Sequence, residues 1–406
     1  MSWTEIKKSA EDGAEFVLAE AANITENYPK RAAGSEGEKQ VREHLASLLS
    51  QCADDVRAES FSFAPDAATG WIYLTVVCAL LAFVAYFFVA FVSVVLIILA
   101  LVPFVLQGVL CLRSLDGMYK TSVSENLVAT AKCKGEVKRR IYLCAHVDAA
   151  PEFRLHAKLG GKFFAAAMAG SVVGVLYMLA ANIARWVWLG SMGAALAADA
   201  YLIVGLVGLI FIPFWVSCFF FVDKRKTVDG ANDDLSGCLT AVAVLKAMRE
   251  SGTVCENTEV GVLLTSAEEC GLRGAYAWCD AHAADDKDVP ALYLVLDTLR
   301  ESDKLAVTSR ELNGLQKTDA EEAAAFAEAA QAVGVNCKKS ACMFGATDAA
   351  AFARRGARAF SVTALGGLPE YYHTDKDTAD NMNAPLIADC IKAVAEFIRR
   401  ADNAED

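Results

Sequence analysis

None of the thirteen cysteines forms a Cys-x-x-Cys pair, and the number is odd. A disulfide framework in a secreted protein normally shows paired cysteines at ordered spacings. Several of these cysteines lie inside apolar segments, where a free cysteine behaves as a small hydrophobic residue. The pattern predicts a chain in a reducing compartment.

The chain also has little that would attract nucleic acid. It carries 38 Lys and Arg against 50 Asp and Glu, a net charge of −12, and no stretch in which basic and aromatic residues alternate. Phosphate binding requires clustered Lys and Arg, so a nucleic-acid partner is not expected. The first residues, MSWTEIKKSAEDGAEF, are charged and do not resemble a secretory signal peptide.

Charge is missing altogether from Trp71–Leu110, which contains no Asp, Glu, Lys or Arg. One membrane crossing takes about 20 apolar residues, so this segment fits two short crossings, although one long helix is the alternative because no turn residue interrupts it. A second apolar block, Phe163–Phe221, predicts two further crossings around RWVWLGSMGAALAAD. Gly170 and Gly174 in this block would allow close helix packing.

Lys and Arg predict the orientation of these crossings. Arg185 is the only basic residue expected in the loops on the far side, and the positive-inside rule then places the remaining chain in the cytoplasm. Each block must cross an even number of times to keep the soluble segments on one side, which favours two crossings in Trp71–Leu110. The basic residues expected on the cytoplasmic side are Arg113, Lys120, Lys158, Lys162, Lys224, Arg225 and Lys226.

The remaining chain alternates apolar strands with amphipathic helices. Strands are predicted at 141–146, 259–266, 291–297 and 358–364, and helices at 35–50, 235–250, 271–283, 318–333 and 386–402, the first opening with a Ser35 and Glu38 capping box. This pattern indicates an α/β fold with a mixed, mostly parallel sheet between helices, together with about four transmembrane helices.

Acidic and imidazole side chains follow the ends of several predicted strands. His146 ends one strand, Glu268 and Glu269 follow a second, and Asp297 ends a third. Ligands of such sheets bind beyond the carboxyl ends of the strands. Two further segments can reach the same edge, through Asp233 in GANDDLSG and His373 in EYYHTDKDT.

This donor set is chemically suited to divalent metal. Imidazole and carboxylate ligands without cysteine fit Zn²⁺, with Mn²⁺ or Co²⁺ as alternatives. Several carboxylates at one sheet edge would repel each other strongly without a cation. Two ions sharing one carboxylate could activate a water molecule and polarise a carbonyl together.

The motifs HVD, GANDDLSG, EECGLRG, LD and YHTDKDT occur in an order that resembles the co-catalytic dizinc aminopeptidases, which have the zinc-exopeptidase fold. FGATDAAAF and NYPKRAAGSEGEKQVREHLASLL resemble further elements of that family. The resemblance implies two zinc ions with Asp233 as the bridge. It pairs His146 with Asp297 and Glu269 with His373, although the sequence itself leaves this pairing open.

The resemblance also implies roles for neighbouring residues. Glu268 would be the general base, and Asp148 would accept a hydrogen bond from His146. Tyr372 would stabilise the oxyanion. Either Tyr372 or the adjacent Tyr371 could instead pack in the core. Asp234 stands where the family often has Asn, and could contact metal or alter the peptide bond after the bridge. Asp348 and Asp375 are weaker candidates near the ligands, and surface positions are expected for His44, His156 and His282.

The sequence thus predicts a membrane-embedded aminopeptidase that acts on short peptides, with its catalytic domain in the cytoplasm. That domain would comprise residues 1–66, 113–157 and 227–406, interrupted by transmembrane hairpins at 67–112 and 158–226. Three alternatives remain open: a glutaminyl cyclase with one zinc, a non-catalytic membrane scaffold, and a peptide sensor. The oligomeric state and the preferred residue cannot be predicted from the sequence.

Overall fold

The computed structural model describes residues 3–189, 200–282 and 288–404. The chain divides into two units that are interleaved along the sequence. The sheet unit comprises Met1–Pro65, Thr121–Pro151 and Thr227–Asp406, and the helical unit comprises Asp66–Lys120 and Glu152–Lys226.

The sheet unit is built on an eight-stranded mixed sheet with the order β1-β2-β6-β3-β7-β12-β8-β11. Strands β3, β6, β7 and β12 run parallel at its centre, and the neighbouring β2 and β8 run antiparallel to them. The strands are β1 Asp55–Phe63, β2 Ser122–Ala131, β3 Arg139–His146, β6 Thr258–Thr265, β7 Ala291–Leu299, β8 Ala306–Thr308, β11 Lys338–Ser340 and β12 Arg358–Ala364. The predicted fold class is confirmed.

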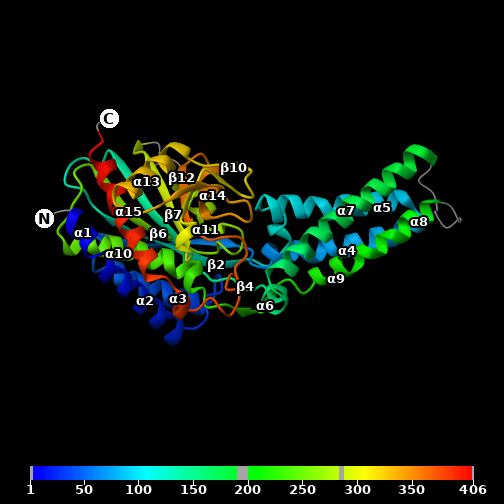
Figure 1. The fold of residues 1–406 in the computed structure, drawn as a ribbon, viewed down its shortest axis with the longest axis horizontal. Helices are drawn as coiled ribbons and strands as arrows, with labels where there is room; N and C mark the ends of the chain where they lie inside the picture. Colours follow the sequence, from blue (N-terminus) through cyan, green and yellow to red (C-terminus); the bar gives the residue numbers. More distant parts are fainter. Residues whose placement is uncertain (1–2, 190–199, 283–287, 405–406) are drawn as a thin grey trace. The chain divides into compact units, whose positions relative to one another are not determined.

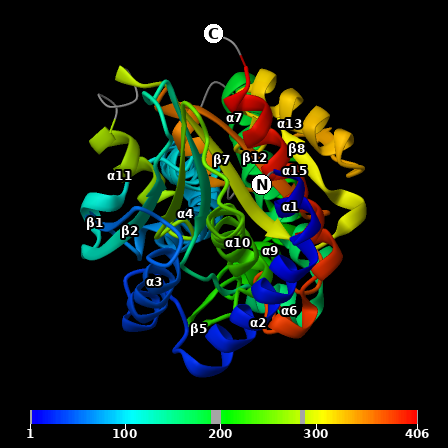
Figure 2. The same cartoon turned by 90° about the vertical axis from the view of Figure 1, so that its left-hand side faces the viewer.

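Helices cover both faces of this sheet (Figures 1 and 2). On one face α10 packs on β3, β6 and β7, and α13 packs on β8 and β12. On the other face α11 contacts β1 and β2, and α14 contacts β7 and β12. The helices of this unit are α1 Trp3–Lys8, α2 Ala10–Asn27, α3 Glu36–Leu49, α10 Ser236–Glu250, α11 Arg273–His282, α13 Ala320–Ala332, α14 Asp348–Arg354 and α15 Ala384–Asp402. Burial on both faces explains why the central strands are almost wholly apolar.

Helix starts follow ordinary capping chemistry. Ser35 accepts a hydrogen bond from the Glu38 amide at the start of α3, as predicted, but the Glu38 carboxylate reaches back to the amide of Gly34 instead of Ser35. Asp319 and Asn383 cap α13 and α15 through their side chains. Each cap satisfies an amide that would otherwise have no acceptor in the first helical turn.

The helical unit contains four helices long and apolar enough to cross a membrane, at Ala67–Phe88, Ala90–Val109, Gly161–Trp188 and Ala200–Cys218. Trp71–Leu110 forms two helices and not one, because the backbone is extended at Val89. The Ser93 hydroxyl donates to the carbonyl of Ala82 at 2.7 Å and ties the two helices together near this break. The elements are α4 Ala67–Phe88, α5 Ala90–Pro103, α6 Arg154–Leu159, α7 Gly161–Leu189, α8 Ala200–Val207 and α9 Ile212–Cys218, with short helical turns at Phe104–Val109, Asp116–Met118 and Gly208–Phe211.

Two expectations about the helical unit are wrong. Arg185 lies within α7 and is buried, and its guanidinium donates to the Tyr86 carbonyl at 2.9 Å, so it is not a loop residue. His156 is buried beside Phe164 and is not on the surface. Of the expected loop after Trp188, residues 190–199 lie outside the described part of the chain. His44 and His282, in the sheet unit, are half-buried and contact glutamates.

The two glycines of the second apolar block do lie at a close helix contact. A Cβ atom at Gly170 would fall 2.7 Å from the Phe214 ring, and one at Gly174 would fall 2.6 Å from Phe211. Any larger residue at either position would push these aromatic side chains away.

The minor elements of the chain are the ribbons β4 Pro151–Glu152 with β5 Asp223–Thr227 and β9 Arg310–Glu311 with β10 Gln316–Lys317, and the short turns at Ala231–Leu235, Ser302–Lys304 and Ala379–Asn381.

Candidate metal centre

The carboxyl ends of three central strands place acidic and imidazole groups at one edge of the sheet. His146 is the last residue of β3 and pairs with Thr265, the last residue of β6. Glu268 and Glu269 follow that strand directly, and Asp297 lies near the end of β7. Parallel strands end at the same edge, so the sheet itself brings these groups together.

Asp233 lies between the two histidines. Its Oδ1 is 3.0 Å from Nε2 of His146, and its Oδ2 is 3.0 Å from Nε2 of His373. Nε2 of His373 is also 3.3 Å from a carboxylate oxygen of Glu269. One carboxylate therefore faces an imidazole on each side, which is the arrangement that a ligand shared by two cations would need.

The side chains form overlapping groups of potential ligands. His146, Asp233 and Asp297 offer atoms within 4.8 Å of one another, and so do Asp233, Glu269 and His373. Asp233 belongs to both groups. In these two groups His146 lies with Asp297 and Glu269 lies with His373, and which of them would share an ion stays a prediction. His146, Glu268 and Glu269 form a third such group.

Several residues around these groups have unusual backbone conformations. Ala267, which precedes Glu268, has φ +56°, Thr298 after Asp297 has φ +52°, and His373 itself has φ +54°. Positive φ costs free energy for residues other than glycine and persists where the surrounding structure imposes it. Some of the backbone strain in the described residues therefore lies beside the polar groups of this cluster.

Asp234 is an anchor for the backbone and does not lie among the potential metal ligands. It is fully buried, and its carboxylate accepts hydrogen bonds from the amides of His146 at 3.2 Å and Gly237 at 3.0 Å. A third hydrogen bond comes from the amide of Thr298 at 3.3 Å. The peptide bond between Asp233 and Asp234 is cis. Asp234 thereby links β3, β7 and the start of α10 at the sheet edge.

Asp148 contacts His146 through its main chain. Nδ1 of His146 lies 2.9 Å from the Asp148 carbonyl oxygen and 3.7 Å from its carboxylate. The carboxylate accepts the amides of Glu268 and Glu269, both at 3.1 Å. Asp148 therefore orients the imidazole and also holds the loop that carries both glutamates.

Burial and the neighbouring charges shift the pKa values of the carboxyl groups in this cluster. Burial raises the pKa of Glu269 to about 8 and that of Asp297 to about 6, and nearby carboxylates add to both shifts. Burial also raises the pKa of Glu268 well above its usual range. Burial alone would raise the pKa of Asp233, but hydrogen bonds from His146 and His373 outweigh it and hold that pKa low.

A divalent cation fits this donor set. One carboxylate oxygen of Glu269 is buried without a hydrogen bond within the described residues, and three more carboxyl groups crowd the same edge. Buried carboxylates that repel each other are stabilised by a cation. Imidazole and carboxylate donors without cysteine suit zinc.

Sequence reasoning missed two buried residues that position the site. The guanidinium of Arg31 donates to the carbonyls of Val147, Asp229 and Gly230 at 2.6–3.0 Å, in the loops that follow His146 and precede Asp233. Asp377 accepts the amides of Asn232 at 2.8 Å and of Asp233 at 3.2 Å. In the sequence, the only indication that either residue matters is that it lies within one of the motifs quoted above.

The weaker candidates divide. Asp375 is exposed. The buried place near the ligands that was expected for Asp375 is taken by Asp377. Asp348 is buried, accepts a hydrogen bond from Thr265 at the end of β6, and its pKa is raised by burial to about 7.

The two adjacent tyrosines differ in their contacts. The ring of Tyr372 stacks on His373 with centroids 4.1 Å apart. Tyr371 is buried, and its hydroxyl has no hydrogen-bond partner within the described residues. Tyr371 is thus the residue that packs inside the fold.

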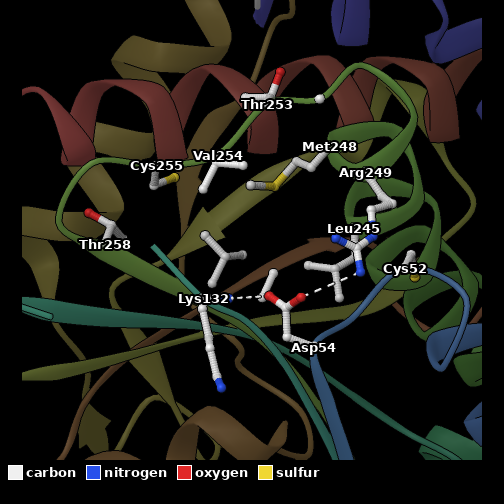
Figure 3. Close-up of a pocket in the computed structure, with 13 residues that line it drawn as sticks. Cys52, Asp54, Lys132, Leu245, Met248, Arg249, Thr253, Val254, Cys255 and Thr258 are labelled. Atoms are coloured by element: carbon white, nitrogen blue, oxygen red, sulfur yellow. Dashed lines mark hydrogen bonds and ion pairs between the residues drawn. The ribbon is translucent and has the colours of Figure 1, made fainter. Parts of the chain in front are cut away.

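Figure 3 shows a separate pocket, whose lining includes residues at the end of β2 and the start of β6. Its lining includes Leu245 and Met248 of α10, and its volume is about 130 Å³. At its rim Asp54 accepts the amide of Lys132 at 2.8 Å and contacts Arg249 at 3.4 Å. The pocket contains none of the metal-site residues and borders the start of β6, whereas Glu268 follows its end.

Comparison with known proteins agrees with this geometry. Residues 220–398 match the model of peptidase family M28. No curated protein matches the chain in sequence. In structure the chain is similar to an aminopeptidase from Aneurinibacillus sp. strain AM-1, with a TM-score of 0.59, 14% identity and coverage of 98% of this chain and 96% of that one.

Two further structures are similar to the same degree. The zinc aminopeptidase BSAP from Bacillus subtilis has a TM-score of 0.56 at 12% identity, covering 97% of this chain and 96% of that one. A glutaminyl cyclase from Bacteroides thetaiotaomicron bound to N-acetylhistamine has the same score and identity, with coverage of 97% and 98%. At such identities the likeness shows the fold.

Proposed function

We propose that the chain is a membrane-embedded metallo-aminopeptidase that removes the N-terminal residue from short peptides, because residues 220–398 match the model of peptidase family M28 and the fold is similar to that of solved aminopeptidases. The observation that carries this proposal is the position of Asp233, with one carboxylate oxygen 3.0 Å from each of two histidines. A site for a single ion has no need of a carboxylate that is shared in this way.

The proposed site holds two zinc ions. His146 and Asp297 would bind one, Glu269 and His373 the other, and Asp233 both. When bound, the ions supply Lewis acidity, which polarises the scissile carbonyl and lowers the pKa of water.

Glu268 is the proposed general base. It belongs to a group of potential ligands with His146 and Glu269, so its carboxylate reaches the same space as theirs. Burial raises its pKa, which strengthens it as a proton acceptor. Its carboxylate would take a proton from water and pass it to the leaving amine. Asp148 fixes its main chain and Arg31 fixes the loop that follows His146.

The four apolar helices support the membrane part of the proposal. They occur in the two insertions that interrupt the sheet unit. Basic residues follow the helices of the first insertion, at Arg113 and Lys120, and lie at both ends of the second insertion, at Lys158 and Lys162 and at 224–226. The positive-inside rule then places the sheet unit in the cytoplasm. This orientation can be checked in sealed vesicles with a cysteine introduced at Lys226 or at Trp188. The measurement is which of the two cysteines an added label reaches.

Removal of metal is expected to abolish peptide hydrolysis. Purified chain treated with a chelator should lose turnover of aminoacyl chromogenic substrates, and Zn²⁺ should restore it at about two ions per chain. Because bound ions stabilise only the folded form, the melting temperature should also fall on chelation. Metal-replete protein that cyclises N-terminal glutaminyl peptides but does not hydrolyse aminoacyl substrates would instead assign the cyclase activity.

Tyr372→Phe is expected to lower kcat by about a hundredfold with little change in metal content, because a hydroxyl beside the ligands can donate to the developing oxyanion. Tyr371→Phe is the matched control. It removes a buried hydroxyl that has no partner in the described structure and should leave kcat unchanged. Equal rates for both variants would remove Tyr372 from the mechanism.

A further inference from the structure

Two loops of the sheet unit contact each other, and one of them is the hairpin that contains strand β10, which Figure 1 labels. The β9–β10 hairpin contacts the loop 341–346. The amide of Asn313 donates to the Gly345 carbonyl at 2.9 Å, and the amide of Cys342 donates to the Arg310 carbonyl at 2.8 Å. At the tip, a Cβ atom on Gly314 would lie 2.9 Å from the sulfur of Met343.

Large apolar side chains project from this surface into solvent. Leu315 is 60% exposed, Met343 71% and Phe344 44%. Single exposed apolar residues are common, but three on two loops that contact each other form a patch, and such patches mark interaction sites.

Positive charge lies on the same hairpin and on the strand that precedes the second loop. Arg310 and Lys317 are directly opposite each other across the hairpin, and both are exposed. Like charges in this position destabilise a strand pair. Lys339 adds an exposed cation on the adjoining strand β11. In the parts of the chain that the structure describes, none of these three cations forms an ion pair, although the whole chain carries a net charge of −12.

The hairpin is held firmly from below. Glu311 is fully buried, and its carboxylate accepts hydrogen bonds from the hydroxyl of Thr308 at 2.8 Å and from the amide of Thr347 at 3.1 Å. The exposed side chains therefore project from a rigid base, which lowers the entropy cost of binding a partner.

We propose that this surface, made of Arg310, Leu315, Lys317, Lys339, Met343 and Phe344, docks on the face of a bilayer rich in anionic lipids. The apolar side chains enter the headgroup layer while the cations contact lipid phosphates and carboxylates. The proposal rests on the membrane embedding in the proposed function. A chain anchored by apolar helices keeps its sheet unit at a high effective concentration near the bilayer, so even a weak contact would be occupied.

Hydrogen exchange on the full chain in lipid nanodiscs tests the proposal. Amides in 309–317 and 338–346 should exchange about tenfold more slowly in discs with roughly one third phosphatidylserine than in pure phosphatidylcholine. High salt should remove this difference, because it screens exposed charges. Reversal of charge in the R310E/K317E/K339E variant should abolish the slowing.

A matched control keeps the same change in net charge. The K8E/K39E/K132E variant alters three exposed lysines elsewhere on the sheet unit and should retain the slowing. The L315S/M343S/F344S variant should lose protection in both lipid mixtures if the apolar side chains enter the bilayer.

Equal exchange in the two lipid mixtures would overturn the proposal. So would a charge-reversed variant that keeps its lipid-dependent protection but loses affinity for acidic peptides, which would assign the surface to a peptide instead. Failure of the peptidase assignment would appear separately, as metal-replete chain without turnover in either disc. Chain that does not enter discs at all would refute the membrane embedding.

Discussion

Asp233→Asn is expected to reduce kcat/KM for aminoacyl substrates by about 10⁴-fold or more and to leave less than one metal ion per chain. The carboxylate of Asp233 is the one group shared by both sets of potential ligands. An amide of the same size keeps the packing but removes the negative charge between His146 and His373. Activity with saturating Zn²⁺ and metal content by elemental analysis measure the two effects.

A control for the loss of one hydrogen-bonded carboxylate is Asp402→Asn. Asp402 accepts the amides of Glu256, Asn257 and Thr258 at 2.9–3.1 Å, at the start of β6 and away from the metal-site edge. This variant should lose some stability and keep its metal content. An Asp233→Asn protein that retains two ions and normal turnover would refute the shared-ligand assignment.

Prediction from the sequence succeeded where the physical signal was local. Strand β3 is apolar from Ile141 to Ala145 and ends in His146, so a buried strand that ends in a polar group could be predicted without a structure. The same holds for β6 before Glu268 and for β7 before Asp297. Because parallel strands end at one edge, the meeting of these residues followed from the fold class.

Prediction failed where function depends on the direction of main-chain groups. Arg31 binds carbonyl oxygens of residues far along the chain, and no spacing in the sequence indicates those partners. Asp148 was expected to accept a hydrogen bond from His146, and the structure shows that its main-chain carbonyl is the acceptor, a detail that the sequence does not indicate. Asp377 was quoted in a motif but not selected, because its role depends on the amides of Asn232 and Asp233.

The helical unit shows a related limit. The absence of a turn residue left open whether Trp71–Leu110 forms one helix or two, and the break at Val89 carries no sequence signature. Hydropathy identifies apolar helices but does not say which side chains face each other. Arg185 was therefore placed in a loop, although the bundle buries it against Tyr86, with its guanidinium 5.6 Å from the ring centre.

Glu268→Gln is expected to lower kcat by about 10³-fold while metal content and KM stay close to those of the unaltered chain. The two side chains have the same shape, so the loop held by Asp148 should not move. What is lost is a group that can accept a proton from water, and general bases typically contribute about 10²- to 10⁴-fold.

The neighbouring residue provides the contrast that separates proton transfer from metal binding. Glu269 groups with Asp233 and His373 as a potential ligand, so Glu269→Gln should lose metal as well as activity, and added Zn²⁺ should restore part of its rate. Added Zn²⁺ should not restore the rate of Glu268→Gln. If both variants lose metal to the same extent, Glu268 is a ligand and the base must be sought elsewhere. If Glu268→Gln keeps its full rate, no proton passes through this residue.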